Sequence, residues 1–217
     1  MTLADYLTRV RRLLHDANAT YWSDTDLTDY INRGRTEVAA RCKNVRQLQT
    51  PTLVAGPDPS TVAYASLPNP NVVDVLSIAL IDGNFRYVLQ QRSYAALVAQ
   101  FRPYTSFQSR PMAFARYGFG VIYFAPAPTI NYPTEWDTAV LPADLPVATP
   151  TTVESMVYPF TEPVAYYAAY QAKINYGEHQ EAERFRTMFE RSVMETTQKM
   201  LAMHTPDQYA DTEGLPW

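Results

Sequence analysis

Three side chains near the start of the sequence are of types used in acid–base or nucleophilic catalysis. His15 and Asp16 are adjacent, and Cys42 is the single cysteine of the chain. Adjacent residues on a helix do not face each other, so His15 and Asp16 do not make the contact that a general acid–base pair needs. Cys42 has no histidine nearby in the sequence and falls on an apolar helix stripe, which predicts a buried core thiol.

Two further clusters match ligand-binding motifs only in part. Glu178, His179 and Glu181 lie together, but the two-histidine helical spacing of zinc hydrolases is absent. Gly118-Phe119-Gly120 is too short to cradle a phosphate and predicts a hairpin turn. The sixteen tyrosines could stack on nucleic-acid bases, but they are not accompanied by matching cationic residues. We therefore expect them in hydrophobic cores and at protein interfaces. We therefore expect no catalytic residue, no cofactor, no metal site and no enzymatic activity.

Composition narrows the class of protein further. The chain has 217 residues, 47% hydrophobic and 18% charged, which is ordinary for a globular protein, with a net charge of -4 and a pI near 5.4. Residues 1–50 carry eight Lys and Arg against six acids, a small excess that predicts an ion-paired helix face. The single cysteine favours a reducing, cytosolic origin. No stretch reaches the roughly 20 apolar residues that span a bilayer, so no membrane contact is expected.

Residues 1–49 predict a pair of helices. Thr2 can cap a first helix, and Ser23 can cap a second that runs to about Lys43. A link this short predicts a helical hairpin, with Gly34 allowing close approach.

Residues 50–160 predict an inserted β module. Residues 60–67, 72–81, 85–90, 112–117 and 121–125 have the composition of strands, and Asp82-Gly83-Asn84 is a tight-turn signal. Ser93 can cap a short helix over residues 94–101. Residues 126–159 are proline-rich and weakly periodic, which predicts a long connection with room for one further strand.

Helical periodicity returns at residues 161–204. Thr161 and Pro163 indicate the start of a helix, and Gly177 indicates its end. Residues 178–203 have the pattern of a second, amphipathic helix. Residues 205–217 lack this period, carry three acids and no basic residue, and predict an extended docking tail. The fold expected from these segments is α+β: a four-helix body made of the N-terminal and C-terminal helix pairs, with a small inserted β module and an extended C-terminal tail.

Two groups of apolar side chains are candidate contact sites. We expect Tyr209, Leu215 and Trp217 in the tail to dock on a portal protein or on a neighbouring subunit, and exposed aromatics of the β module to contact tail proteins. The latter are Phe107, Tyr117 and Trp136.

The opening and closing helices resemble those of phage adaptor proteins, which are also called head-tail connector or tail accessory proteins. In that family a first helix leads through a turn and a Trp-Ser-Asp cap into a helix that begins Asp-Leu-x-x-Tyr-Ile-Asn. The corresponding segments here are Leu13-Leu14-His15-Asp16, Tyr21-Trp22-Ser23-Asp24, Asp26-Leu27-Thr28-Asp29-Tyr30-Ile31-Asn32 and Pro163-Val164-Ala165-Tyr166-Tyr167 with the helix that follows.

This resemblance implies a structural virion protein at the head-tail junction, made in the cytoplasm of a bacterial host. It implies a homo-oligomeric, dodecameric ring that binds the portal protein and offers a platform to tail nozzle or tail fibre proteins. Double-stranded DNA would pass through the ring without specific binding, which suits a mildly acidic subunit. The alternatives are a helical peptide-binding module and a small hydrolase.

Overall fold

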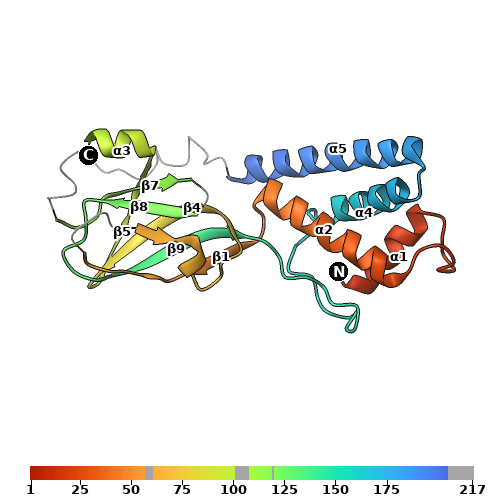
Figure 1. The fold of residues 1–217 in the computed structure, drawn as a ribbon, viewed down its shortest axis with the longest axis horizontal. Coiled ribbons are helices and arrows are strands. Elements are labelled where there is room, and N and C mark those ends of the chain that lie inside the picture. Colours follow the sequence, from red (N-terminus) through yellow and green to blue (C-terminus); the bar gives the residue numbers. More distant parts are fainter. Residues whose placement is uncertain (57–60, 101–107, 119, 205–217) are drawn as a thin grey trace, which may run out of the picture. The chain divides into compact units, whose positions relative to one another are not determined.

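The computed structural model describes residues 1–56, 61–100, 108–118 and 120–204 (Figure 1). The chain divides into two compact units. One combines Met1–Asn44 with the chain from Pro142 onward and is called the helical unit; the other, Val45–Leu141, is called the β unit.

The expected four-helix body with a small β module is wrong. Across the described residues the fold is α+β with five α-helices and nine strands in two sheets. The β part is an independent unit with its own core, and a fifth helix belongs to it. The prediction underestimated this part because several of its strands do not show the apolar alternation expected of a half-buried strand.

The first two helices begin where their capping residues predict. The Thr2 side chain caps α1 (Leu3–Leu13) and exchanges bonds with Asp5 in a capping box. The Ser23 hydroxyl accepts the backbone N–H of Asp26 at the start of α2 (Asp24–Cys42). Both N-cap predictions are confirmed.

The last two helices are α4 (Glu162–Asn175) and α5 (His179–His204). Pro163 lies in the first turn of α4 as expected, but the Thr161 side chain makes no capping bond, because its backbone is already helical. Gly177 separates the helices with a φ of +85°, a conformation that glycine adopts without strain.

Helix α4 is the centre of the helical unit, because it packs against α1, α2 and α5. Small side chains allow these close approaches: Ala165, Ala168, Ala169 and Ala172 are all fully buried. Gly34 of α2 faces α4 rather than α1, since a Cβ at Gly34 would lie 3.1 Å from the Tyr167 ring. The close approach predicted at Gly34 therefore exists, but with a different helix.

The β unit contains two sheets that share one core. The first sheet has the order β1-β9-β4-β5, with β2 also paired to β9, and the second has the order β3-β8-β7-β6. The strands are β1 (Arg46–Gln49), β2 (Thr52–Leu53), β3 (Thr61–Ala63), β4 (Val72–Asp82), β5 (Phe85–Val88), β6 (Gln90–Arg92), β7 (Ala113–Tyr117), β8 (Val121–Ala125) and β9 (Tyr132–Val140). Residues from both sheets, such as Phe124 and Trp136, pack together in this core.

Strand β9 explains why the β part was underestimated. Its buried positions alternate as in any two-layer sheet, but Thr134 and Thr138 occupy two of them. Both threonines are satisfied inside: Thr134 accepts the indole N–H of Trp136, and Thr138 donates to the Gln47 carbonyl at 2.7 Å. A strand with polar residues at its buried positions lacks the alternation of apolar and polar residues by which strands are recognised in a sequence.

Helix α3 (Tyr94–Gln100) covers the outer face of the second sheet. Ser93 caps it by accepting the Ala96 N–H, as expected. Leu97 is fully buried against alanines of β7 and β8. This helix closes one side of the β unit.

Candidate interaction surfaces

A buried ion pair holds residues 142–160, called the strap, to helix α2. Arg35 donates through Nε to Glu154 Oε2 at 2.6 Å and through Nη2 to Glu154 Oε1 at 2.8 Å. The side chains are only 2% and 1% exposed. Such a two-pronged bond fixes the orientation of the strap as well as its position.

Two more contacts of α2 extend this anchor along the strap. The Asn32 amide pairs with the backbone of Leu145, donating to its carbonyl at 3.1 Å and accepting its N–H at 2.9 Å. Arg35 also donates to the Ala143 carbonyl at 2.8 Å. At the other end, the Glu154 N–H donates to the Met1 carbonyl at 3.0 Å. The strap is therefore held at both ends.

The electrostatics of this anchor favour the charged pair. Burial raises the pKa of Glu154, but hydrogen bonds from Arg35 and from the Met156 N–H outweigh burial, so the pKa lies below its ordinary value of 4.5. Burial, followed by the charge of Glu154, raises the pKa of the adjacent Tyr6 phenol, which therefore stays neutral. Because both side chains are buried, we interpret the Arg35–Glu154 pair as a structural contact that fixes the strap on α2.

The strap exposes three large apolar side chains among polar ones such as Thr152 and Ser155. Val153, Val157 and Tyr158 are 75%, 65% and 72% exposed. The nearby carboxylate, Glu154, points inward. The buried carboxylate is the unusual feature, because charged groups are almost never fully buried unless they are paired. We call Val153, Val157 and Tyr158 the strap face.

A second buried acid organises the loop between α1 and α2. Asp16 accepts the backbone N–H groups of Thr20, Tyr21 and Trp22, and Arg11 donates to it at 3.0 Å. Burial raises the pKa of Asp16, but these backbone hydrogen bonds and the Arg11 charge bring the pKa below its ordinary value. Asp16 is thus a loop organiser, and it does not pair with His15.

The same loop presents aromatic side chains at one end of the helical unit. Tyr21 and Tyr176 are exposed, and Trp22 lies between them with ring centroids 6.0 and 5.8 Å away. The Lys173 ammonium lies 5.7 Å from the Trp22 ring and is held by Glu178 and Glu181. These acids are therefore engaged with a lysine in an ion-pair cluster.

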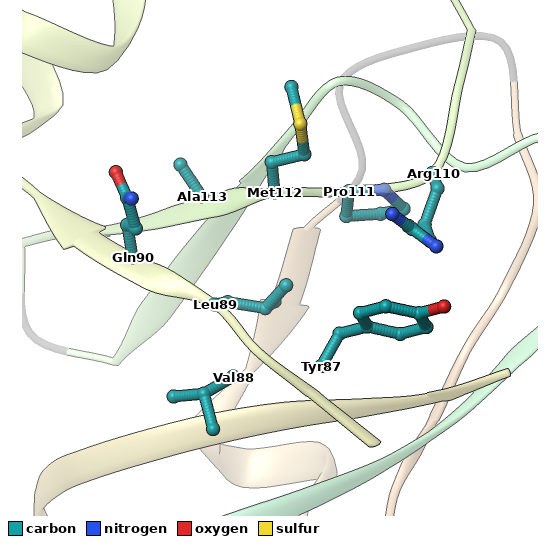
Figure 2. Close-up of a pocket in the computed structure, with 8 residues that line it drawn as sticks. All are labelled: Tyr87, Val88, Leu89, Gln90, Arg110, Pro111, Met112 and Ala113. Atoms are coloured by element: carbon teal, nitrogen blue, oxygen red, sulfur yellow. The ribbon is translucent and has the colours of Figure 1, made fainter. Parts of the chain in front are cut away.

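A pocket of about 250 Å³ opens where β5 of the first sheet meets β6 and β7 of the second (Figure 2). Figure 2 shows the Arg110 guanidinium over the Tyr87 ring, 3.8 Å from its centroid. Val88 and Met112 are exposed at its rim. Among the described residues that line it, the only charged side chain is Arg110, which also lies 3.9 Å from a carboxylate oxygen of Asp82.

Three tyrosines form a further patch on the outer face of the second sheet. The ring of Tyr94 lies 4.5 Å from that of Tyr117 and 5.1 Å from that of Tyr123. Tyr117 is 52% exposed. Aromatic rings with polar tips are favoured at protein interfaces, so Tyr117 remains a candidate contact with tail proteins.

The other predicted contact residues do not share this patch. Trp136 was expected on the surface, but it is fully buried between the sheets and donates its indole N–H to Thr134 at 2.8 Å. Burial of the Trp136 ring is favourable because the ring packs in the core and its indole N–H keeps a hydrogen-bond acceptor there. Phe107, Tyr209, Leu215 and Trp217 lie outside the described residues.

Cys42 is the buried core thiol that the sequence predicts. It lies 3.5 Å from the Thr197 hydroxyl, and burial raises the pKa of the thiol. Within the described part of the chain, no cluster of three His, Cys, Asp or Glu side chains could hold a metal ion. In the same part, no helix is both long and apolar enough to cross a membrane.

The strap anchor was missed by sequence reasoning. Arg35 and Glu154 are separated by 119 positions, and neither stands out locally. One signal was available: residues 142–160 contain only two acids, Asp144 and Glu154, and no basic residue. A carboxylate in a proline-rich stretch without basic residues is a candidate for pairing with a distant arginine.

A comparison with protein-family models places the chain in a known family. The model of a family described as SU10 adaptor protein matches residues 1–210, which is nearly the whole chain. No curated protein matches the sequence. Residues in the segments that carry the resemblance make structural contacts in this protein. Asp16 binds the loop between α1 and α2, Ser23 caps α2, and Asn32 binds the strap.

Proposed function

The chain belongs to the SU10 adaptor protein family, a family of phage head-to-tail adaptors, and from this premise we propose that it is the repeating subunit of the head-tail ring. It is a structural component of a phage virion. In our proposal a dodecameric ring binds the portal protein, prolongs the DNA channel and carries the tail nozzle or tail fibres. The family match over residues 1–210 is the observation that supports this function most strongly.

The chemistry of the surface is compatible with a DNA conduit. Each phosphate neutralised by a protein cation adds salt-dependent affinity, which would retard the passing genome. The chain has a net charge of -4, and many of its arginines are engaged by carboxylates, among them Arg41 with Glu190 and Arg86 with Glu135. A subunit of this kind fits a channel that lets DNA pass without holding it.

The proposal includes no catalytic step. Four of the side chains that looked reactive have structural contacts: Asp16 accepts loop N–H groups, Cys42 is buried beside Thr197, and Glu178 and Glu181 bind Lys173. These contacts support a protein that works by assembling with other proteins.

Native mass spectrometry and negative-stain imaging test the proposal, with the purified protein alone and mixed with its portal. We expect a closed ring, stacked coaxially on the portal in the mixture. A protein that stays monomeric and does not bind portal would contradict the proposal. Weak binding of double-stranded DNA fragments, abolished by moderate salt, is expected for the channel role, whereas tight salt-resistant binding is not.

A further inference from the structure

The pocket shown in Figure 2 lies beside two edge strands of the β unit. Strand β5 ends the first sheet and pairs with β4, whereas β6 ends the second sheet and pairs with β7. Within the described residues, the outer edges of β5 and β6 have no further strand partner. An extended peptide can pair with such an edge, and a pocket beside the edge then selects one of its side chains.

The pocket has room for one aromatic side chain. Its volume is about 250 Å³, and a cavity of about 150 Å³ is enough to bind benzene. Val88 and Met112 at the rim are 63% and 54% exposed. A ring inserted here would therefore cover apolar surface that faces water.

The arginine in the pocket has unused hydrogen-bond donors. Arg110 lies 3.8 Å from the centre of the Tyr87 ring and 3.9 Å from a carboxylate oxygen of Asp82, which is too far for a hydrogen bond. A guanidinium carries five N–H donors. A second arginine, Arg92, donates to the pocket residue Gln90 at 2.7 Å and forms no ion pair within the described residues. The pocket therefore suits a ligand that brings carboxylates beside an aromatic ring.

Residues 205–217 of this chain have the complementary sequence. They carry three acids and no basic residue. In an extended segment every second side chain lies on the same face, so Asp207, Tyr209 and Asp211 share one face with the ring between two carboxylates. The thirteen residues can span roughly 40 Å, and β5 has only four residues, so the segment is long enough to follow the edge past the pocket.

We propose that residues 205–217 of this chain bind along the β5 edge and insert Tyr209 into the pocket. The ring covers the apolar rim at Val88 and Met112, and the flanking carboxylates bind Arg110 and its neighbouring arginine. This inference goes beyond the proposed ring, because the contact can form within one chain or between two copies of it. The cross-linking experiment below distinguishes these two cases.

Binding of a synthetic peptide measures the contact. The receptor is the chain truncated after His204, whose circular dichroism and thermal midpoint are compared with those of the intact chain. A labelled peptide of residues 205–217 should bind this receptor in fluorescence anisotropy, and Arg110→Gln should weaken binding about tenfold or more. Arg86→Gln is the matched control, because Arg86 is an exposed arginine of the same strand that is already bound to Glu135.

Changes in the peptide test which of its side chains are recognised. Tyr209→Ala should weaken binding about tenfold or more, because it removes the ring that fills the pocket. Asp207→Asn with Asp211→Asn should weaken binding and remove most of its dependence on salt. Trp217→Ala removes another aromatic ring from the same peptide and should change the affinity less than about twofold.

Cysteine cross-linking tests the contact in the intact chain and does not depend on the truncation. In a Cys42→Ala background, Ala210→Cys with Met112→Cys should form a disulfide after oxidation. Ala210→Cys with Leu48→Cys is the matched control, because Leu48 is similarly exposed but lies on β1, at the other end of the first sheet. A cross-linked monomer indicates binding within one chain, and a ladder of covalent dimers and larger species indicates binding between copies.

The outcomes separate this inference from the proposed function. A peptide that does not bind the folded receptor, or that binds the Arg110→Gln variant equally well, would overturn the inference. A Met112→Cys pair that cross-links no better than the Leu48→Cys pair would also overturn it. A peptide that binds only the portal would overturn the inference and leave the proposed ring standing. Binding and cross-linking as expected, in a protein that forms no ring alone or with portal, would support the inference and contradict the proposed function.

Discussion

The helical unit and the β unit are stabilised by different kinds of contact. The β unit is one continuous stretch of chain, and an apolar core with satisfied threonines lies between its sheets. The helical unit is made from two distant stretches, and buried charged groups, Arg35 with Glu154 and Arg11 with Asp16, tie its irregular segments to the helices. Irregular segments have few backbone bonds of their own, so they need directional side-chain bonds to hold one conformation.

The largest test of this contrast is excision of the β unit. Its first and last residues are adjacent, because the Val140 N–H donates to the Val45 carbonyl at 2.9 Å. We expect residues 45–141 to fold alone, since the unit contains its own core. Trp136 is the only tryptophan in this range, so its blue-shifted fluorescence and a cooperative thermal transition report folding. Red-shifted emission from the isolated fragment would show that the unit depends on the helices.

Removing one partner of the strap anchor should damage only the helical unit. Glu154→Ala leaves the Arg35 charge buried without its carboxylate, which should cost about 3–5 kcal/mol in the free energy of unfolding of that unit. Urea titrations followed by circular dichroism at 222 nm measure this loss, and Trp136 fluorescence in the excised β unit provides the reference. A loss below about 0.5 kcal/mol, the level of ordinary surface substitutions, would contradict the anchoring role.

Acid should weaken the same anchor. The pKa of Glu154 is lowered in the folded protein, so its contribution to stability is complete above the ordinary value of 4.5 and is lost as the pH falls through the lower folded value. Glu154→Gln lacks this titration. The stability difference between wild type and Glu154→Gln should therefore be largest near pH 7 and shrink as the pH approaches 3, as measured by urea unfolding. A constant difference across this range would rule out the titration of Glu154 as its source.

The smallest effect is expected for a charge pair on the β unit. Arg86 donates to Glu135 at 2.7 Å, but both side chains are substantially exposed. Exposed ion pairs contribute about 0–1 kcal/mol, so Arg86→Ala should change the unfolding free energy by less than about 1 kcal/mol. A urea titration at low and high salt measures the change. A loss as large as that of Glu154→Ala would remove the contrast between the two units.

Local signals predicted local structure well. The caps at Thr2 and Ser23, the hairpin turn at Asp82-Gly83-Asn84 and the helix start at Ser93 all appear where the sequence places them. Each depends on a few neighbouring residues, because a capping bond or a tight turn closes within about four positions. The size of the β part and the burial of Trp136 were not predicted, since inward threonines on β9 conceal the strand.

The candidate surfaces were predicted only in part. Tyr117 was named and is exposed, whereas the strap face was not recognised, because Val153, Val157 and Tyr158 resemble ordinary apolar residues of a loop. Exposure of an apolar side chain depends on what the rest of the chain leaves uncovered, which a sequence window does not contain.

The sequence by itself determined the helix starts and the hairpins, because these follow from interactions between residues close in the chain. The family could also be recognised from short segments of the sequence. Only the tertiary structure decided which charges are buried and which apolar residues remain outside. Arg35 and Glu154 are 119 positions apart, and their pairing turns one face of the strap toward α2 and the other toward solvent. Such a pair forms only after distant elements have packed, because its hydrogen bonds must compensate for lost hydration in a site that folding itself creates.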